Sequence, residues 1–381
     1  MTRLWPVAGL AISVVLPSAA IVDKFSGTPA TVCYLLLATL LVGRWHTEIV
    51  VVVAGWSTRR VQWAGCLTLV GLLALYAVVN PRANAGVWGP GSDRDEALNA
   101  ATGELLAGRY PYHVQTYLQN PSGTLPGALL LAVPFKLAGD ASYQNVFWLS
   151  TLLLVGGAVI RESGRALVLF WTLIVFSPEV LHEYVVGGDL LANAIYVPVA
   201  VIWLVSAFGD GRRLGTVLLP AVFLGITLAS RANFLLLAPL VLVALARRGG
   251  TTPAVKVMAV TSLTVVVLIA PYYLYAPDVF SPFRTANKFY QLDHVLPFAG
   301  LILPALSGLV AVALACSRSS GQLPELLQRC AVTLAVPIVL ATLLEIAGPG
   351  STAFTFTSYG LSAVFFGGAG YFPALVPATR T

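Results

Sequence analysis

Apolar stretches long enough to cross a lipid bilayer recur along this whole chain and are separated by short polar joints. Of its 381 residues, 57% are hydrophobic and only 10% are charged. A water-soluble protein of this length needs far more charge to cover its surface. No polar stretch exceeds about 45 residues, which is too few for an ordinary independent domain. The sequence therefore predicts an all-α integral membrane protein that forms one transmembrane domain over residues 1–381.

We expect a polytopic bundle of about twelve transmembrane helices. The apolar run at 44–60 is too short to span and is expected at the membrane interface. The first expected span also resembles a secretory signal, because PSAA at 17–20 matches a small-residue cleavage site. The expected spans are 5–21, 29–43, 61–79, 143–160, 166–181, 190–208, 214–230, 232–246, 255–275, 295–315, 325–347 and 355–376.

The apolar segment 125–138 is short and holds Pro126, Pro134 and Lys136. If it does not cross the membrane, four arginine pairs fall on one side, as the positive-inside rule requires. If it crosses, the later pairs change sides. We therefore expect a re-entrant or surface-lying helix here, and residues 80–142 as a large extracytoplasmic loop of a plasma-membrane protein. The pairs are Arg59/Arg60, Arg161/Arg165, Arg212/Arg213 and Arg247/Arg248.

Three acids crowd together in this outer loop, at Asp93, Asp95 and Glu96. One interpretation is a helix start, in which Ser92 or Asp93 caps the helix and Asp93 with Glu96 forms a capping box. Capping needs one acid, however, and adjacent like charges repel unless something cationic lies nearby. The other interpretation is a carboxylate that acts as a base or holds a divalent cation such as Mg²⁺ or Mn²⁺.

Further polar residues lie in the same outer segments. Asp189 caps a helix that starts at Leu190, or it belongs to a site at this face. His182 and Glu183, and likewise His113, are interfacial polar groups or part of that site. The sequence has no HxxxH or comparable spacing of ligand residues, so the signal for a metal centre is weak.

Three cationic residues are expected near the outer surface. Arg231 stands between two apolar helices, where an arginine either snorkels to the interface or meets a counter-ion such as a lipid phosphate. Arg284 and Lys288 are four residues apart, so on a helix they share one face. With Tyr290 and His294 nearby they are candidates for binding a phosphate group, or they are ordinary interfacial charges.

Several stretches resemble the GT-C glycosyltransferases, which are polytopic enzymes that use polyprenyl-phosphate sugars outside the cytoplasmic membrane. The first outer loop of that family is similar to the acidic helix start here, followed by AGRYPY at 107–112 and the proline-rich NPSGTLPG at 120–127. The resemblance continues in SPEVLHEYVVGGDLLAN at 177–193 and in GITLASRANFLLLAPLVL at 225–242. In the family the acidic loop usually follows the first span, whereas two further spans precede it here.

The resemblance implies an essential acid at Asp93 or Asp95 and a second acid at Asp189, with Glu96 beside them. The donor would be a polyprenyl-phosphate sugar, and the acceptor a glycan, lipid or protein. One carboxylate would deprotonate the acceptor hydroxyl, which attacks the anomeric carbon with inversion, while cations offset the charge of the leaving phosphate. The candidate substrate-binding residues are Arg231, Arg284, Lys288, Tyr112, His182 and His113.

Two other functions stay open on the sequence alone. A polytopic transporter or lipid-linked sugar flippase would also carry polar residues among apolar helices, although such proteins often show repeated halves and this chain shows no convincing repeat. A non-catalytic scaffold would leave the concentrated acids unexplained. The formal charge of +6 does not indicate nucleic acid, because the basic residues lie at segment ends, where anionic membrane lipids account for them.

Overall fold

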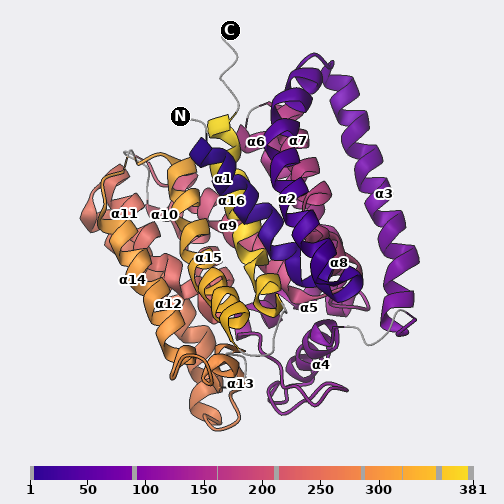
Figure 1. Cartoon of the computed structure of the whole chain (residues 1–381). Helices are drawn as coiled ribbons and strands as arrows, with labels where there is room; N and C mark the ends of the chain where they lie inside the picture. The colour runs from indigo at the N-terminus through magenta and orange to yellow at the C-terminus, as the bar shows by residue number, and fades with distance from the viewer. Residues whose placement is uncertain are drawn as a thin grey trace.

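The computed structural model describes residues 4–87, 92–160, 162–209, 214–284, 288–319, 321–348 and 354–375, and every named element in these ranges is a helix (Figure 1). The elements are α1 (Leu4–Val15), η1 (Leu16–Ser18), α2 (Ala19–Ala54), α3 (Thr58–Asn84), α4 (Arg94–Leu106), α5 (Pro126–Leu137), α6 (Tyr143–Ile160), α7 (Ser163–Val175), α8 (Pro178–Val186), α9 (Asp189–Ala207), α10 (Leu214–Leu228), η2 (Ala232–Leu237), α11 (Ala238–Gly249), α12 (Thr251–Tyr275), α13 (Ser281–Arg284), η3 (Lys288–Leu292), α14 (Ala299–Cys316), α15 (Leu323–Ala347), η4 (Thr355–Gly360) and α16 (Leu361–Leu375).

The architecture is that of a helical membrane protein, but the predicted number of spans is not confirmed. Within the described residues, seven helical runs are long and apolar enough to cross a membrane. The count rises to eight if α7 and α8, which meet at 80°, form one broken span. The expected spans 5–21 and 29–43 both fall in one helical run, Trp5–Ala54, which is broken at Gly27 (φ 78°, ψ 167°), so that α1 packs against α2. The run extends into the expected interfacial segment 44–60 and ends at Ala54. Other expected spans form shorter helices such as α10.

The expected non-spanning segment 125–138 forms α5, a helix of 12 residues. At about 1.5 Å per residue it is roughly 18 Å long, well short of a hydrocarbon core of about 30 Å. Its first turn is tied to the end of α10 by bonds from Leu125 N to Ser230 O (2.9 Å) and from Gly127 N to Ala229 O (2.8 Å). A Cβ at Gly127 would lie 2.1 Å from Ile226 O, so this close packing requires glycine.

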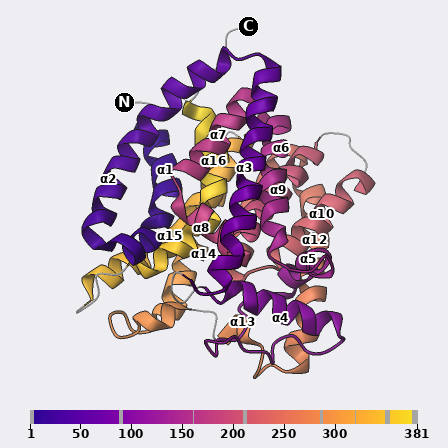
Figure 2. The ribbon, with the colours of Figure 1, turned by 90° about the vertical axis from the view of Figure 1, so that its right-hand side faces the viewer.

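The two ends of the bundle differ in charge. At one end, arginine side chains bind backbone carbonyl groups of neighbouring segments. Arg247 donates to Ser317 O (2.8 Å), and Arg248 donates to Val205 O (3.1 Å). The acids at 93–96 lie at the opposite end, which carries α4 and α13 and which we call the α4 end (Figures 1 and 2). This separation agrees with the predicted orientation, and the side of the membrane that each end faces stays a prediction from the positive-inside rule.

The central helix of the core is α9, which is buried along most of its length. It is apolar on all sides, as expected of a helix surrounded by other helices. It packs against α6, α10 and α16. Its first residue, Asp189, is only 1% exposed, so α9 places a buried charged group at the α4 end.

A second apolar cluster joins α4 to the rest of the α4 end. It contains Leu98 of α4, Leu125, Tyr112 and Phe280. The Tyr112 and Phe280 rings meet edge to face at 4.8 Å. Figure 2 shows α4 lying across the end of the bundle. The cluster therefore fixes the acidic residues of α4 against the membrane helices.

Candidate functional site

A cavity of about 360 Å³ lies at the α4 end, between α9, η2, α14, α15 and η4. Two cationic residues, Arg231 and Lys288, line it together with Asn193 and Asn233. The rest of its wall is mainly apolar and includes Leu236, Leu301, Pro304, Leu334, Ile338 and Phe356.

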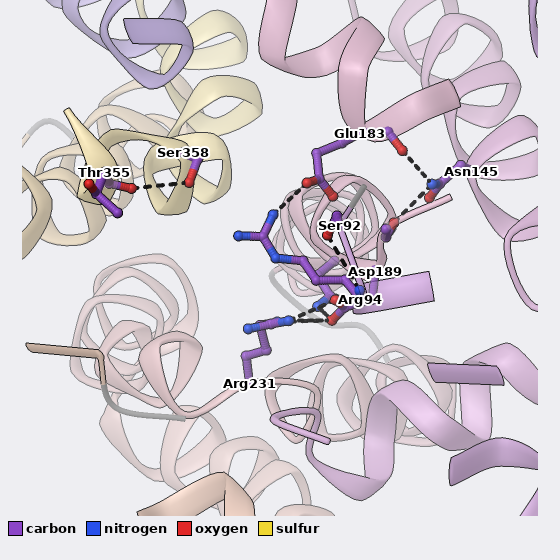
Figure 3. A network of polar contacts seen from close by, with 10 residues as sticks. Ser92, Arg94, Asn145, Glu183, Asp189, Arg231, Thr355 and Ser358 are labelled. Carbon is purple, nitrogen blue, oxygen red and sulfur yellow. Dashed lines mark hydrogen bonds and ion pairs between the residues drawn. The ribbon is translucent and has the colours of Figure 1, made fainter. Parts of the chain in front are cut away.

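Arg231 is held at the cavity by a bidentate ion pair with Asp189 (Figure 3). Its Nε lies 2.9 Å from Asp189 Oδ2, and its Nη2 lies 2.7 Å from both carboxylate oxygens. Asn193 donates to Asp189 Oδ2 at 2.8 Å, and Tyr196 donates to Asn193. Both oxygens of Asp189 are therefore engaged, and this carboxylate suits the role of positioning Arg231 better than that of a base.

The local chain geometry explains this pairing. Gly187 ends α8 in the left-handed region at φ 82°, which brings Asp189 into the first turn of α9. Arg231 is the extended residue before η2, at φ −150° and ψ 146°, so its side chain leaves the helical path. Of the two interpretations of Asp189, the capping one does not hold, because α9 begins at Asp189 itself and the Asp189 carboxylate binds Arg231 and Asn193.

A second ion pair lies beside the first. Arg94 Nη1 donates to Glu183 Oε1 at 2.5 Å, and Glu183 is completely buried. The Arg94 guanidinium also lies 5.2 Å from the ring centre of Tyr359, which lines the cavity. Figure 3 shows Arg94 between Glu183 and the Asp189–Arg231 pair. Sequence reasoning missed Arg94, although it is the one basic residue inside the acidic run 93–96.

Asp93 fastens the loop that follows α4 instead of capping the helix. It occupies the N-cap position, but its side chain makes no capping hydrogen bond, so the capping-box interpretation does not hold for Asp93. Ser92, the other residue considered as a cap, accepts a hydrogen bond from Arg94 N at 3.3 Å through its Oγ. Its Oδ2 accepts hydrogen bonds from Thr116 Oγ1 (2.6 Å) and Asn120 Nδ2 (2.8 Å). Glu96 has a similar role, since its Oε2 accepts from Tyr117 N at 3.2 Å. The folded loop thus supplies donors that a local sequence pattern does not reveal.

Asp95 differs from its two acidic neighbours. It is half-buried, and no side chain in the described ranges donates a hydrogen bond to its carboxylate. Burial raises the pKa of Asp95 to about 6, and the nearby charges of Asp140 and Glu96 act in the same direction. Such a carboxylate is mostly ionised at neutral pH and is basic enough to accept a proton. Asp95 itself does not line the cavity.

The other predicted residues are distributed around this centre. Tyr112 is 2% exposed and belongs to the aromatic cluster, where its hydroxyl has no hydrogen-bond partner among the described residues. His113 is exposed and packs against the ring of Tyr110 at 4.9 Å. Arg284 ends α13, and its side chain lies outside the described part of the structure. Lys288 begins the next named element, η3, so the expected shared helix face of these two residues falls partly outside the described residues.

His182 lies in α8 with two buried acids, Glu179 and Glu183. Sequence reasoning missed Glu179, and the expectation that no ligand spacing comparable to HxxxH exists is wrong, because two glutamates flank His182 at helical spacing. The usable pattern is Glu179-x-x-His182-Glu183, which places three ligand-type residues at positions i, i+3 and i+4 on one helix face.

Comparisons with protein-family models, curated proteins and solved structures find no match for this chain. Its chemistry is therefore inferred from these residues themselves.

Proposed function

We propose that this protein is a membrane glycosyltransferase that moves a sugar from a polyprenyl-phosphate donor to a glycan, lipid or protein acceptor with inversion. The observation that carries the proposal is the cavity at the α4 end, which combines a mainly apolar wall with the cations Arg231 and Lys288. A lipid phosphate has the matching chemistry, since an apolar chain and an anionic group are joined in one molecule.

Arg231 and Lys288 each keep hydrogen-bond donors that no described residue uses. Asp189 engages Nε and Nη2 of Arg231, and no described residue bonds to Nη1. Lys288 makes no ion pair within the described ranges. A guanidinium presents several fixed donors and suits phosphate oxygens, whereas an ammonium acts as a point charge. Together they can bind two oxygens of one phosphate group.

The apolar wall accounts for the lipid part of the donor. Leu301 and Pro304 of α14 and Ile338 of α15 line the cavity. Leu301 is 60% exposed, so this wall continues onto the outer surface of the bundle, where lipid would lie. A polyprenyl chain can therefore leave the cavity along α14 and enter the membrane without passing a charged group.

Asp95 is the proposed base. It takes the proton of the acceptor hydroxyl as that oxygen attacks the anomeric carbon, and the bond from this carbon to the phosphate oxygen breaks. Polyprenyl monophosphate leaves, and Arg231 and Lys288 stabilise its added charge. Arg94, which precedes Asp95 in α4, lies 5.2 Å from the ring centre of Tyr359 at the cavity wall, so the start of α4 borders the cavity.

The test is sugar transfer by the purified chain in detergent or in vesicles, with a panel of labelled polyprenyl-phosphate hexoses and pentoses. We expect Arg231→Ala and Lys288→Ala to lower transfer by about tenfold to a thousandfold, as is typical when charge stabilisation is lost. Lys288→Ala should leave stability unchanged, whereas Arg231→Ala also removes the counter-ion of the buried Asp189 carboxylate and should lower stability. The control is Lys256→Ala, which removes an exposed cation of α12 and should leave transfer unchanged.

If Arg231→Ala and Lys288→Ala both leave the kinetics with the sugar donor unchanged, these residues do not bind the donor phosphate. Failure to use any lipid-phosphate sugar, combined with movement of a solute or a lipid-linked sugar across vesicles, would favour the transporter or flippase instead.

A further inference from the structure

One face of α8 carries three side chains that can ligate a metal ion, Glu179, His182 and Glu183. Their spacing of i, i+3 and i+4 places them next to one another on the helix. One carboxylate oxygen of each glutamate and one ring nitrogen of His182 all lie within 4.8 Å of one another. This distance allows all three atoms to contact a single ion placed between them.

The two glutamates are buried, His182 is half-buried, and the hydrogen-bonding capacity of the three side chains is incompletely satisfied. Glu179 is 2% exposed and Glu183 is 0% exposed. Glu183 Oε2 and His182 Nδ1 are buried atoms without a hydrogen-bond partner among the described residues. No described side chain donates to the Glu179 carboxylate. Because buried polar groups in folded proteins are nearly always paired, these atoms indicate a ligand.

Charge balance leads to the same conclusion. Glu179 and Glu183 are two buried carboxylates, and Arg94 forms an ion pair with Glu183 alone. Lys24 of α2 and Arg94 attract the Glu179 carboxylate, but the described residues contain no ion pair to it. A buried carboxylate without a partner is costly. A divalent cation between the three side chains would supply the missing positive charge.

We propose that Glu179, His182 and Glu183 bind a divalent transition-metal ion, with zinc as the best match. Two carboxylate oxygens and one imidazole nitrogen are common zinc ligands and leave a fourth position for water or a substrate oxygen. An imidazole ligand favours zinc over Mg²⁺ and Ca²⁺, which prefer oxygen ligands. This site goes beyond the proposed sugar transfer and does not depend on it.

Gly188 keeps Glu183 in place for this role. A Cβ at residue 188 would lie 2.0 Å from Glu183 Oε2, so any larger residue must displace this carboxylate. Gly188→Ala therefore changes the site without removing a ligand. It provides a second way to disturb metal binding that leaves all three ligand types present.

The test uses the full chain in detergent after removal of metal with a chelator. Zinc is then titrated and followed by calorimetry, and the bound metal is measured by elemental analysis. We expect stoichiometric zinc binding by the unaltered protein, and weaker Mg²⁺ binding. Glu179→Gln and His182→Asn should lower zinc affinity by at least the roughly 10- to 100-fold that is typical when a ligand loses its supporting partner.

Matched controls are His113→Asn and Glu104→Gln, which change an exposed histidine and a glutamate of the same α4 end. These controls should keep full zinc affinity. Zinc should also raise the melting temperature of the unaltered protein but not of the Glu179→Gln/His182→Asn double variant. Since glutamine is nearly isosteric with glutamate, the Glu179→Gln chain should fold.

Equal zinc affinity in the unaltered protein and the double variant would overturn the proposal. So would an equal loss of affinity in the two controls. Neither readout involves sugar transfer, so a failed metal site and a failed transferase are told apart.

Discussion

Replacing Asp189 by asparagine tests whether the Asp189–Arg231 pair stabilises the fold and positions the arginine. The two side chains are 2% and 19% exposed, so the variant leaves a largely buried guanidinium without its counter-ion. Removal of one partner from a buried pair typically costs about 3–5 kcal/mol. Asparagine keeps one acceptor oxygen for Arg231 and for Asn193, so we expect the lower end, about 3 kcal/mol.

The assay is denaturant titration of the purified protein in detergent, followed by the fluorescence of its eight tryptophans. The matched control is Glu104→Gln. Glu104 forms an ion pair with Arg109 at a similar distance, 2.6 Å, but the Arg109 side chain is 64% exposed. Water already solvates that arginine, so we expect no resolvable change in the control.

A double variant separates coupling from two independent effects. Replacement of a buried pair by apolar residues of similar volume is often neutral or stabilising. Asp189→Leu combined with Arg231→Met should therefore be less destabilised than Asp189→Asn alone. The single variants Asp189→Leu and Arg231→Met complete the cycle. If the double variant loses as much free energy of unfolding as these two single variants added together, the pair is not coupled and the reasoning fails.

Four further predictions follow from the same end of the molecule. Tyr112→Phe should keep the free energy of unfolding or raise it by about 1 kcal/mol, since the lost hydroxyl is buried without a described partner; a lost transfer activity would instead indicate substrate contact. Asp93→Asn should lower stability by about 1–3 kcal/mol through weaker bonds from its loop, and it should keep transfer activity. Asp95→Asn should lower transfer about a hundredfold to ten-thousandfold. Transfer by the unaltered protein should also fall as the pH drops below about 6, because the base must be ionised and burial raises the pKa of Asp95 to about 6. In a chain without exposed cysteines, Ala138→Cys should react with impermeant reagents only from outside and Thr252→Cys only from the cytoplasm, and the reverse pattern would contradict the topology.

The stability of the fold gives an independent check on Asp95. Its pKa in the folded protein, about 6, lies above the ordinary value of 3.8, so the folded state binds the proton more tightly than the unfolded chain. The ionised carboxylate therefore lowers stability at neutral pH, and this loss should disappear as the pH falls from about 7 towards 4. Asp95→Asn should stabilise the protein at pH 7, and a destabilised variant would show that Asp95 has a partner.

The helical class could be predicted from the sequence because it follows from composition and from the length of apolar runs. The short α5 was predictable as well, since the apolar segment is short and the arginine pairs argue against a crossing. Pro126 begins the helix, whereas Pro134 lies inside it. The stretch 44–60 was misleading, because the charged residues before its short apolar run suggested that a helix ends there. Arg44 and Glu48 pair at i, i+4 with 2.9 Å between them, so both charges lie on the surface of α2 while the helix continues to Ala54.

The candidate site was only partly predictable, because its partners are far apart in the chain. Asp189 and Arg231 are separated by 42 residues, and Arg94 and Glu183 by 89. The residues next to an acid in the sequence show that it stands at a helix start. They do not show whether its side chain caps the helix or pairs with a distant arginine. The same limit explains Asp93, whose donors are in a loop that folds back from more than 20 residues away.

The polar groups at the α4 end divide by how far the protein itself satisfies them. Oδ2 of Asp93 and both carboxylate oxygens of Asp189 accept hydrogen bonds, so these two residues hold the loop and the arginine in place. Among the described residues, Nη1 of Arg231 and the carboxylates of Asp95 and Glu179 have no side-chain partner. Since folding normally pairs such groups, those left over in a satisfied network are the ones that a ligand would complete. A structure with bound polyprenyl phosphate should therefore place phosphate oxygens on Nη1 of Arg231, and a phosphate found away from it would show that these groups serve only the fold.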